Sequence, residues 1–209
     1  MRKVRDYYFN KAKKEKYPAR SIYKLEEVQK KYRFLRPGDS VLDLGCHPGS
    51  WSLYASEEVG KRGVVVGVDL QETAGAPRPE GAEIHWLCQD IMDPEMITMV
   101  RKFRPAFKVL ISDLAPKTTG NRWADHQQSL HLVRRTLALA GILLHEGGHY
   151  ICKIFQGEDF PEFVQEVKEL FETVKVIKPK SSRTESREVF VLGMGYRKSQ
   201  DSQRPVEQS

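Results

Sequence analysis

Short apolar runs rich in Val, Ile and Leu recur along the chain. They cover residues 40–45, 63–70, 82–88, 107–114, 148–155, 173–178 and 187–196. Their length and their β-branched residues predict strands. Most of the runs are apolar throughout, which is typical of strands buried on both faces of a sheet.

Between these runs, apolar residues recur at helical spacing around residues 50–59, 94–103, 123–144 and 159–172. Alternating strands and helices predict an α/β fold, a doubly wound and mostly parallel seven-stranded sheet covered on both faces. No helical pattern separates the last two runs. We therefore expect a hairpin there, with the final strand antiparallel.

The chain is expected to divide into three parts. Residues 1–36 read as a basic arm followed by a helix packed on the domain, residues 37–196 as the domain itself, and residues 197–209 as a flexible polar tail. Ser21 is expected to cap the helix of the first part. The apolar positions of that helix recur at helical spacing, at Ile22, Leu25, Val28 and Tyr32.

The composition of the 209 residues, 40% hydrophobic and 30% charged, indicates a soluble globular protein. No apolar stretch approaches the roughly 18 residues that a membrane helix needs, and no secretion signal is present, so we expect a cytoplasmic protein without membrane contact. Cys46, Cys88 and Cys152 are widely spaced and lie in no metal-binding pattern. Neither a disulfide framework nor a metal site is expected.

The net charge of +6 is concentrated in two clusters. One contains Lys11, Lys13, Lys14, Lys16 and Arg20, and the other Lys178, Lys180, Arg183 and Arg187. The aromatic residues Tyr7, Tyr8, Phe9 and Tyr17 interleave with the first cluster. Either cluster alone is compatible with a solvated surface, but cations mixed with aromatic rings suit the phosphates and unstacked bases of RNA.

The stretch VLDLGCHPGSWS lies where the first strand should pass into a helix. Gly45 and Gly49 allow a sharp turn and a close approach of the backbone to a ligand. Asp69 ends the second strand and follows Gly49 by 20 residues, a position that suits hydrogen bonds to the hydroxyls of an adenosine ribose. Asp90, beyond the third strand, is placed to reach the adenine edge. Ligands of such sheets bind outside the carboxyl ends of the strands.

The spacing of the glycines bears on the kind of cofactor. It is GxxxG rather than the GxGxxG of dinucleotide sites, which disfavours an NAD-dependent oxidoreductase. An acidic turn that follows Asp43 suits the cationic sulfonium of S-adenosylmethionine better. Taken alone, the motif is also compatible with a tight turn that binds nothing.

Four charged residues occupy otherwise apolar surroundings: Lys24, Asp113, Lys153 and Glu188. A lysine inside a buried strand is costly unless it is paired or lines a cleft. For Lys153 alone, a purely structural ion pair would be an equally good explanation. Lys24 and Glu188 are weak signals when taken singly.

Six segments in order, ARSIYKLEEV, DLGCHPGSWS, VDL, SDLAP, KIFQGEDF and SSRTESREVF, resemble the FtsJ/RrmJ family of RNA ribose 2′-O-methyltransferases over nearly the whole chain. The resemblance implies a Rossmann-like, S-adenosylmethionine-dependent methyltransferase fold. It implies a catalytic tetrad of Lys24, Asp113, Lys153 and Glu188. It implies cofactor contacts at Gly49, Trp51, Asp69, Asp90 and Asp113. The chain departs from the family pattern at Cys46, His47 and Ser50.

By this resemblance the protein methylates a ribose 2′-hydroxyl, expected to be that of a uridine, in 23S ribosomal RNA within the large subunit. It is expected to act as a monomer without a metal. Lys153 is the expected general base, with Lys24 as a neighbouring cation, Asp113 orienting Lys153, and Glu188 positioning Lys24 or the ribose. Methylation of tRNA by the same tetrad stays open. So does a catalytically silent RNA-binding assembly factor, although such a factor would not need the complete tetrad.

Overall fold

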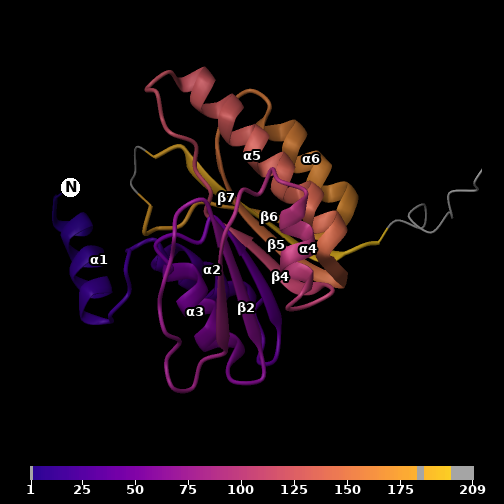
Figure 1. Cartoon of the computed structure of the whole chain (residues 1–209). Helices are drawn as coiled ribbons and strands as arrows, with labels where there is room; N and C mark the ends of the chain where they lie inside the picture. The colour runs from indigo at the N-terminus through magenta and orange to yellow at the C-terminus, as the bar shows by residue number, and fades with distance from the viewer. Residues whose placement is uncertain (1, 183–185, 199–209) are drawn as a thin grey trace, which may run out of the picture.

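A seven-stranded sheet forms the centre of the structure (Figure 1). The structure is a computed structural model. It describes residues 2–182 and 186–198, with side chains from residue 7 onward. Its strands are β1 (Ser40–Leu44), β2 (Val64–Asp69), β3 (Glu83–Cys88), β4 (Phe107–Ser112), β5 (Leu144–Phe155), β6 (Phe171–Ile177) and β7 (Glu188–Tyr196). The strand order is β3-β2-β1-β4-β5-β7-β6, and β7 alone runs antiparallel to the other strands. The predicted sheet, its C-terminal hairpin and its antiparallel last strand are confirmed.

Helices cover both faces of this sheet. They are α1 (Arg2–Lys14), α2 (Ile22–Tyr32), α3 (Ser50–Val59), α4 (Glu95–Arg101), α5 (Arg122–Leu143) and α6 (Phe160–Leu170). In Figure 1, α2 and α3 lie on one face and α4, α5 and α6 on the other, whereas α1 stands at the side of the molecule. The four predicted helical stretches of the domain are therefore confirmed.

Strand residues alternate between two hydrophobic cores. Val41, Val65 and Val109 pack with α2 and α3, and their neighbours Leu42 and Leu110 pack with the helices of the other face. All five side chains are fully buried. Because both faces are covered in this way, polar chemistry is concentrated where the strands end.

In the N-terminal part the structure adds one helix that was not predicted and contradicts one predicted cap. The basic arm contains a helix, α1, in which Val4, Tyr8 and Ala12 recur at helical spacing among many charged residues. Ser21 precedes α2 but does not cap it, because its backbone is itself helical (φ −58°, ψ −23°) and its hydroxyl bonds no helical N–H. The Ser21 carbonyl accepts a hydrogen bond from the indole N–H of Trp51 instead, at 3.0 Å.

Some expectations concern parts of the chain that the structure does not describe. Arg183 of the second basic cluster lies outside the described residues, as does all of the expected tail beyond residue 198. The division of the chain after residues 36 and 196 stays a prediction. Within residues 2–182 and 186–198, no helix is long and apolar enough to span a bilayer.

Candidate active site

The carboxyl ends of the parallel strands bring the predicted catalytic residues together. Asp113 directly follows β4, and Lys153 lies in the neighbouring strand β5, where Ser112 pairs in register with Cys152. Glu188 is the first residue of the antiparallel strand β7, so it reaches the same edge of the sheet. Lys24 is contributed by α2, which covers the face of the sheet that carries Ile151 and Phe190.

Lys153 and Asp113 form a buried ion pair. The Lys153 Nζ lies 2.8 Å from Asp113 Oδ1 and donates a hydrogen bond to the Asp113 carbonyl oxygen at 2.6 Å. Only 7% of the lysine side chain and 17% of the aspartate side chain are exposed. The amine therefore has one fixed position, held by a carboxylate and a carbonyl from the adjacent strand end.

Lys24 and Glu188 form a second ion pair beside the first. Lys24 Nζ lies 2.8 Å from Glu188 Oε2 and 5.7 Å from the centre of the Phe190 ring. Burial raises the pKa of Glu188, but the charges of Lys24 and Lys153 and the hydrogen bond from Lys24 outweigh it and hold this pKa below its usual value. The carboxylate of Glu188 thus interacts electrostatically with both lysines, so the two ion pairs are coupled. We refer to these four residues as the catalytic group.

The glycine turn lies at the end of β1 and needs its glycines for conformation and space. Gly45 and Gly49 have φ angles of +82° and +103°, which side chains rarely adopt. A Cβ on Gly45 would come within 2.5 Å of the Leu114 side chain, and a Cβ on Gly49 within 3.2 Å of the Trp86 ring. The turn therefore packs closely against the segment after β4 and against β3.

Asp69 and Asp90 lie at the ends of the next strands, as predicted. Asp69 accepts hydrogen bonds from the backbone N–H of His47, at 3.0 Å, and of Gln71, at 2.9 Å, which ties the end of β2 to the glycine turn. Asp90 is exposed and accepts the N–H of Met92 at 2.8 Å. Since a carboxylate has about four acceptor positions, both residues keep capacity for a ligand.

Asp43 is a site residue that the sequence reasoning noted in the turn motif without giving it a role. It lies in the inner strand β1, fully buried, and its Oδ2 accepts the hydroxyl of Ser52 at 2.6 Å. Its Oδ1 has no partner among the described residues. Burial, and then the charges of Asp113 and Asp69, raise the pKa of Asp43 to about 7. The signal that could have identified it was an acid within an apolar strand.

Trp51 lies among packing contacts. Its side chain is 3% exposed, its indole N–H is bonded to the Ser21 carbonyl, and its ring centre lies 5.7 Å from that of Phe190. The Trp51 side chain therefore links α3 to α2 and β7. Its expected contact with a cofactor stays a prediction.

The three departures from the family pattern have distinct surroundings. The hydroxyl of Ser50 accepts the Ala19 N–H at 2.7 Å, so it fixes the segment between α1 and α2 to the glycine turn. Cys46 is buried, and burial raises the pKa of its thiol. His47 is exposed, with Nδ1 3.3 Å from the Thr73 hydroxyl.

The three cysteines are free, and the described residues contain no group of three or more His, Cys, Asp or Glu side chains that could hold a metal ion. The chemistry available at this edge of the sheet is therefore that of two lysines, a set of carboxylates and the backbone of a tight glycine turn.

The model of the FtsJ-like methyltransferase family matches residues 17–196. The chain belongs to the FtsJ-like methyltransferase family. The match begins before α2 and ends with β7, so it includes every predicted catalytic and cofactor-binding residue. An FtsJ-like chain is a methyltransferase by family, in agreement with the expectation from the sequence.

Similar proteins extend this assignment. The chain is 64% identical over 200 residues to the ribosomal RNA large subunit methyltransferase E of Desulfotalea psychrophila, covering 96% of this chain and 100% of that one. It is 46% identical to the protein of the same name from Desulfosudis oleivorans, covering 95% and 94%. Among solved structures, a ribosomal RNA methyltransferase of Plasmodium falciparum superposes with a TM-score of 0.75 at 26% identity, covering 86% and 98%.

Proposed function

We propose that this protein methylates a ribose 2′-hydroxyl of large-subunit ribosomal RNA with S-adenosylmethionine as the methyl donor. The proposal rests on two neighbouring ion pairs, Lys153–Asp113 and Lys24–Glu188, at the carboxyl edge of the sheet. The names of the relatives supply the class of RNA. We place the activity in the cytoplasm, on the large ribosomal subunit, and assign it to a monomer.

The residues of this edge fit S-adenosylmethionine. Asp43, Asp69 and Asp113 bring three carboxyl groups together at the ends of β1, β2 and β4, and one oxygen of Asp43 is buried without a partner among the described residues. A positively charged ligand would stabilise such a set. Gly45 and Gly49 would give it backbone contacts, and Asp69 would accept its ribose hydroxyls. When bound, S-adenosylmethionine supplies a methyl group on a positively charged sulfur.

The protein groups then have to prepare the attacking oxygen. The ribose 2′-hydroxyl is a poor nucleophile until its proton leaves, and Lys153 in its neutral form would accept that proton at Nζ. Asp113 holds the amine in place through its carboxylate and its carbonyl. Lys24 would stabilise the developing charge on the ribose oxygen, and Glu188 fixes Lys24 at 2.8 Å.

The test replaces Lys153 by Ala and by Arg. Lys153→Ala should lower methyl transfer by at least the roughly 10²–10⁴-fold that a general base contributes, and leave the affinity for S-adenosylmethionine nearly unchanged. Lys153→Arg should fail as well, because a guanidinium stays protonated. The assay is transfer of labelled methyl groups to large-subunit particles from cells that lack the enzyme, measured across pH.

The same assay separates the competing functions. Activity of Lys153→Arg with an unchanged pH profile would contradict the general-base role and leave Lys153 as a positioning cation. Methyl transfer to tRNA in preference to ribosomal particles would contradict the choice of RNA. A wild-type protein that binds the particles and transfers no methyl group would instead be an assembly factor.

A further inference from the structure

Trp123, in the first turn of α5, is unusually exposed for its size. About two thirds of it, 66%, is accessible to solvent, whereas Trp51 is 3% exposed and Trp86 donates its indole N–H to the Gly75 carbonyl. The indole N–H of Trp123 has no acceptor among the described residues. A large ring in this situation is available for a partner, and its stacking surface is the largest of any side chain.

The backbone beneath Trp123 is firmly held. The side chain of Asn121 accepts the N–H groups of Trp123, at 3.0 Å, and Ala124, at 3.2 Å. Asp125 accepts both the N–H and the hydroxyl of Thr119, at 2.7 and 2.9 Å. The ring is therefore presented from a fixed helix start, so a partner that stacks on it need not order a loop first.

A shallow hollow of about 470 Å³ lies beside the next turns of α5, after Trp123. Gln127 lines it and lies one helical turn after Trp123, and residues four apart share a helix face. Gln128 and His131 carry hydrogen-bonding groups with no partner in the described part of the chain. The full lining is Pro116, Gln127, Gln128, His131 and Leu132. An apolar floor with free amide and imidazole groups suits the flat face and polar edge of a nucleobase.

This hollow lies close to the catalytic group. Pro116 follows Asp113 by three residues, so their Cα atoms are at most about 11 Å apart. Arg187, the neighbour of Glu188 in the chain, donates a hydrogen bond to the Arg122 carbonyl at 3.3 Å and joins the start of α5 to the start of β7. The exposed Lys117 and Arg122 directly neighbour Pro116 and Trp123 in the chain and add positive charge there.

We propose that Trp123 binds an unpaired base of the RNA substrate, one or two nucleotides from the methylated ribose, and that the hollow further along α5 receives the next base. The first base stacks on the indole ring, Gln128 and His131 face the edge of the second, and Lys117 and Arg122 meet the phosphates. This inference rests on the proposed function, because it assigns a second contact to the same RNA. It concerns a residue that takes no part in the chemistry.

The test measures binding of a single-stranded oligouridylate of about 12 nucleotides by tryptophan fluorescence and by filter binding. Wild-type fluorescence should be quenched on binding. Trp123→Ala should lose this quenching and weaken binding about 5- to 150-fold, the effect of removing one base stack. Trp123→Phe should keep most of the affinity. The dependence on salt should be the same in all three, because stacking neutralises no phosphate.

Ile142→Ala is the matched control, since Ile142 is exposed (45%) at the opposite end of the same helix and should not affect binding. Unchanged affinity of Trp123→Ala, with unquenched wild-type fluorescence, would overturn the subsite alone. So would a change of solution mass in Trp123→Ala without a change in RNA affinity, which would mark a protein contact. Failure of the wild-type protein to bind RNA would overturn the proposed function as well.

Discussion

At the scale of single residues, the apolar context of the chain identified the type and the strand end of most site residues, whereas their pairing, Lys153 with Asp113 and Lys24 with Glu188, was expected only from the family resemblance. An acid or lysine beside an apolar run is visible in the printed chain, and this feature distinguishes Asp113, Lys153 and Glu188. Which lysine pairs with which carboxylate depends on strand order, and β7 inserts between β5 and β6. Asp43 received no role, because the burial and the neighbouring charges that raise its pKa arise only when β1 packs beside the ends of β2 and β4.

Asp43 should make the stability of the protein depend on pH. Its pKa is about 7 in the folded state against 3.8 for the free side chain. Between these values the unfolded chain has released the proton and the folded protein still binds it, so the free energy of unfolding falls as pH rises. His149 acts in the opposite direction over this range, because burial lowers its pKa to about 4. The effect of Asp43 therefore appears as a difference between two proteins: relative to Asp43→Asn, the free energy of unfolding of the wild type should fall by on the order of 3 kcal/mol between pH 5 and pH 8. Asp43→Asn should be the more stable protein at pH 8, as measured by urea unfolding.

Glu188 gives a control of opposite sign in the same experiment. Its pKa lies below the usual value in the folded state, so its contribution to stability is present above the unfolded pKa and is lost as pH falls through the folded one. Glu188→Gln should therefore be less stable than the wild type at pH 7, with a difference that shrinks toward acid pH. Parallel pH profiles of Asp43→Asn and the wild type would contradict the account of Asp43.

At the scale of elements, strands were predicted well because runs of Val, Ile and Leu are unambiguous, whereas α1 was missed. The described face of α1 packs through few apolar groups, with Ala12 buried and the Tyr8 ring 5.2 Å from that of Tyr23 in α2. Lys11 adds an ion pair, 3.8 Å from Glu26. The apolar row of this helix in the sequence, Val4, Tyr8 and Ala12, is narrow and lies among charged residues, so the helix depends on these tertiary contacts and was not recognised.

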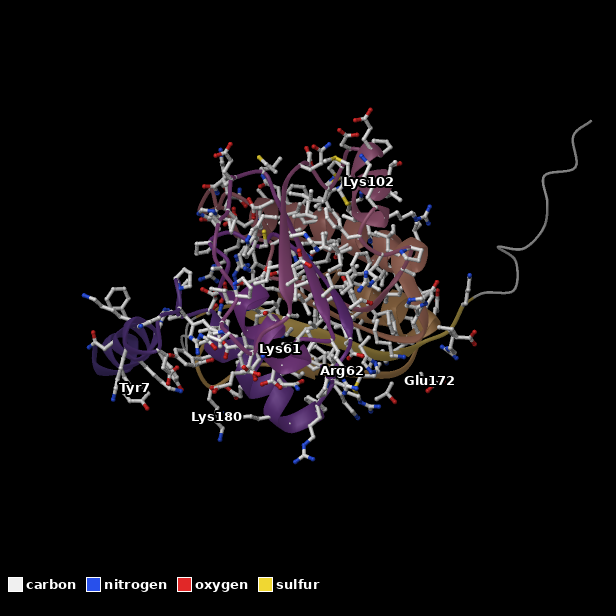
Figure 2. All side chains as sticks on the ribbon, turned by 60° about the horizontal axis from the view of Figure 1, so that its bottom comes forward. Tyr7, Lys61, Arg62, Lys102, Glu172 and Lys180 are labelled. Carbon is white, nitrogen blue, oxygen red and sulfur yellow. The ribbon has the colours of Figure 1, made fainter. Side chains whose placement is uncertain are left out.

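The two basic clusters lie on the same side of the molecule, on either side of α2. The segment after β6 is tied to α2, because Glu27 accepts the backbone N–H of Lys180 at 2.9 Å. Both views place this segment on the same side of the molecule as α1, with Lys180 and Tyr7 labelled in Figure 2. The clusters therefore flank the helix that carries Lys24, as expected for a surface that binds RNA phosphates next to the active site.

Neutralising Lys13, Lys14 and Lys16 together with Gln should weaken RNA binding. All three are exposed, and their amines have no partner within the described residues. The slope of log K against log salt should become shallower by about 0.7 for each phosphate of a single strand that is no longer neutralised, while the affinity for S-adenosylmethionine should not change. Filter binding from low to high salt measures the slope.

A matched triple variant removes the same charge elsewhere, at Arg62, Lys102 and Lys168. Arg62 and Lys102 lie away from α1 in Figure 2 and precede β2 and β4, at the edge of the sheet opposite the catalytic group. If this control weakens RNA binding as much as the α1 variant, net charge alone attracts RNA, and α1 has no specific part in it.

At the scale of the whole molecule, the acids and the lysines at the carboxyl edge make a folded state that is costly without its ligand. Asp43 is buried with an unpartnered oxygen, and Asp69 and Asp113 act on it electrostatically. A cation bound among these carboxylates would relieve part of that cost, so ligand binding and global stability should be linked.

S-adenosylmethionine should therefore raise the melting temperature in a concentration-dependent way. At about 100 times its Kd, a ligand that binds only the folded state adds about 2.7 kcal/mol, or roughly 5–11 °C for a chain of this size. Asp69→Ala should need a higher ligand concentration for the same shift, whereas Lys153→Ala should respond like the wild type. NAD is the control ligand, because the GxxxG turn lacks a pyrophosphate cradle. A shift with NAD and none with S-adenosylmethionine would contradict the assignment of the cofactor site.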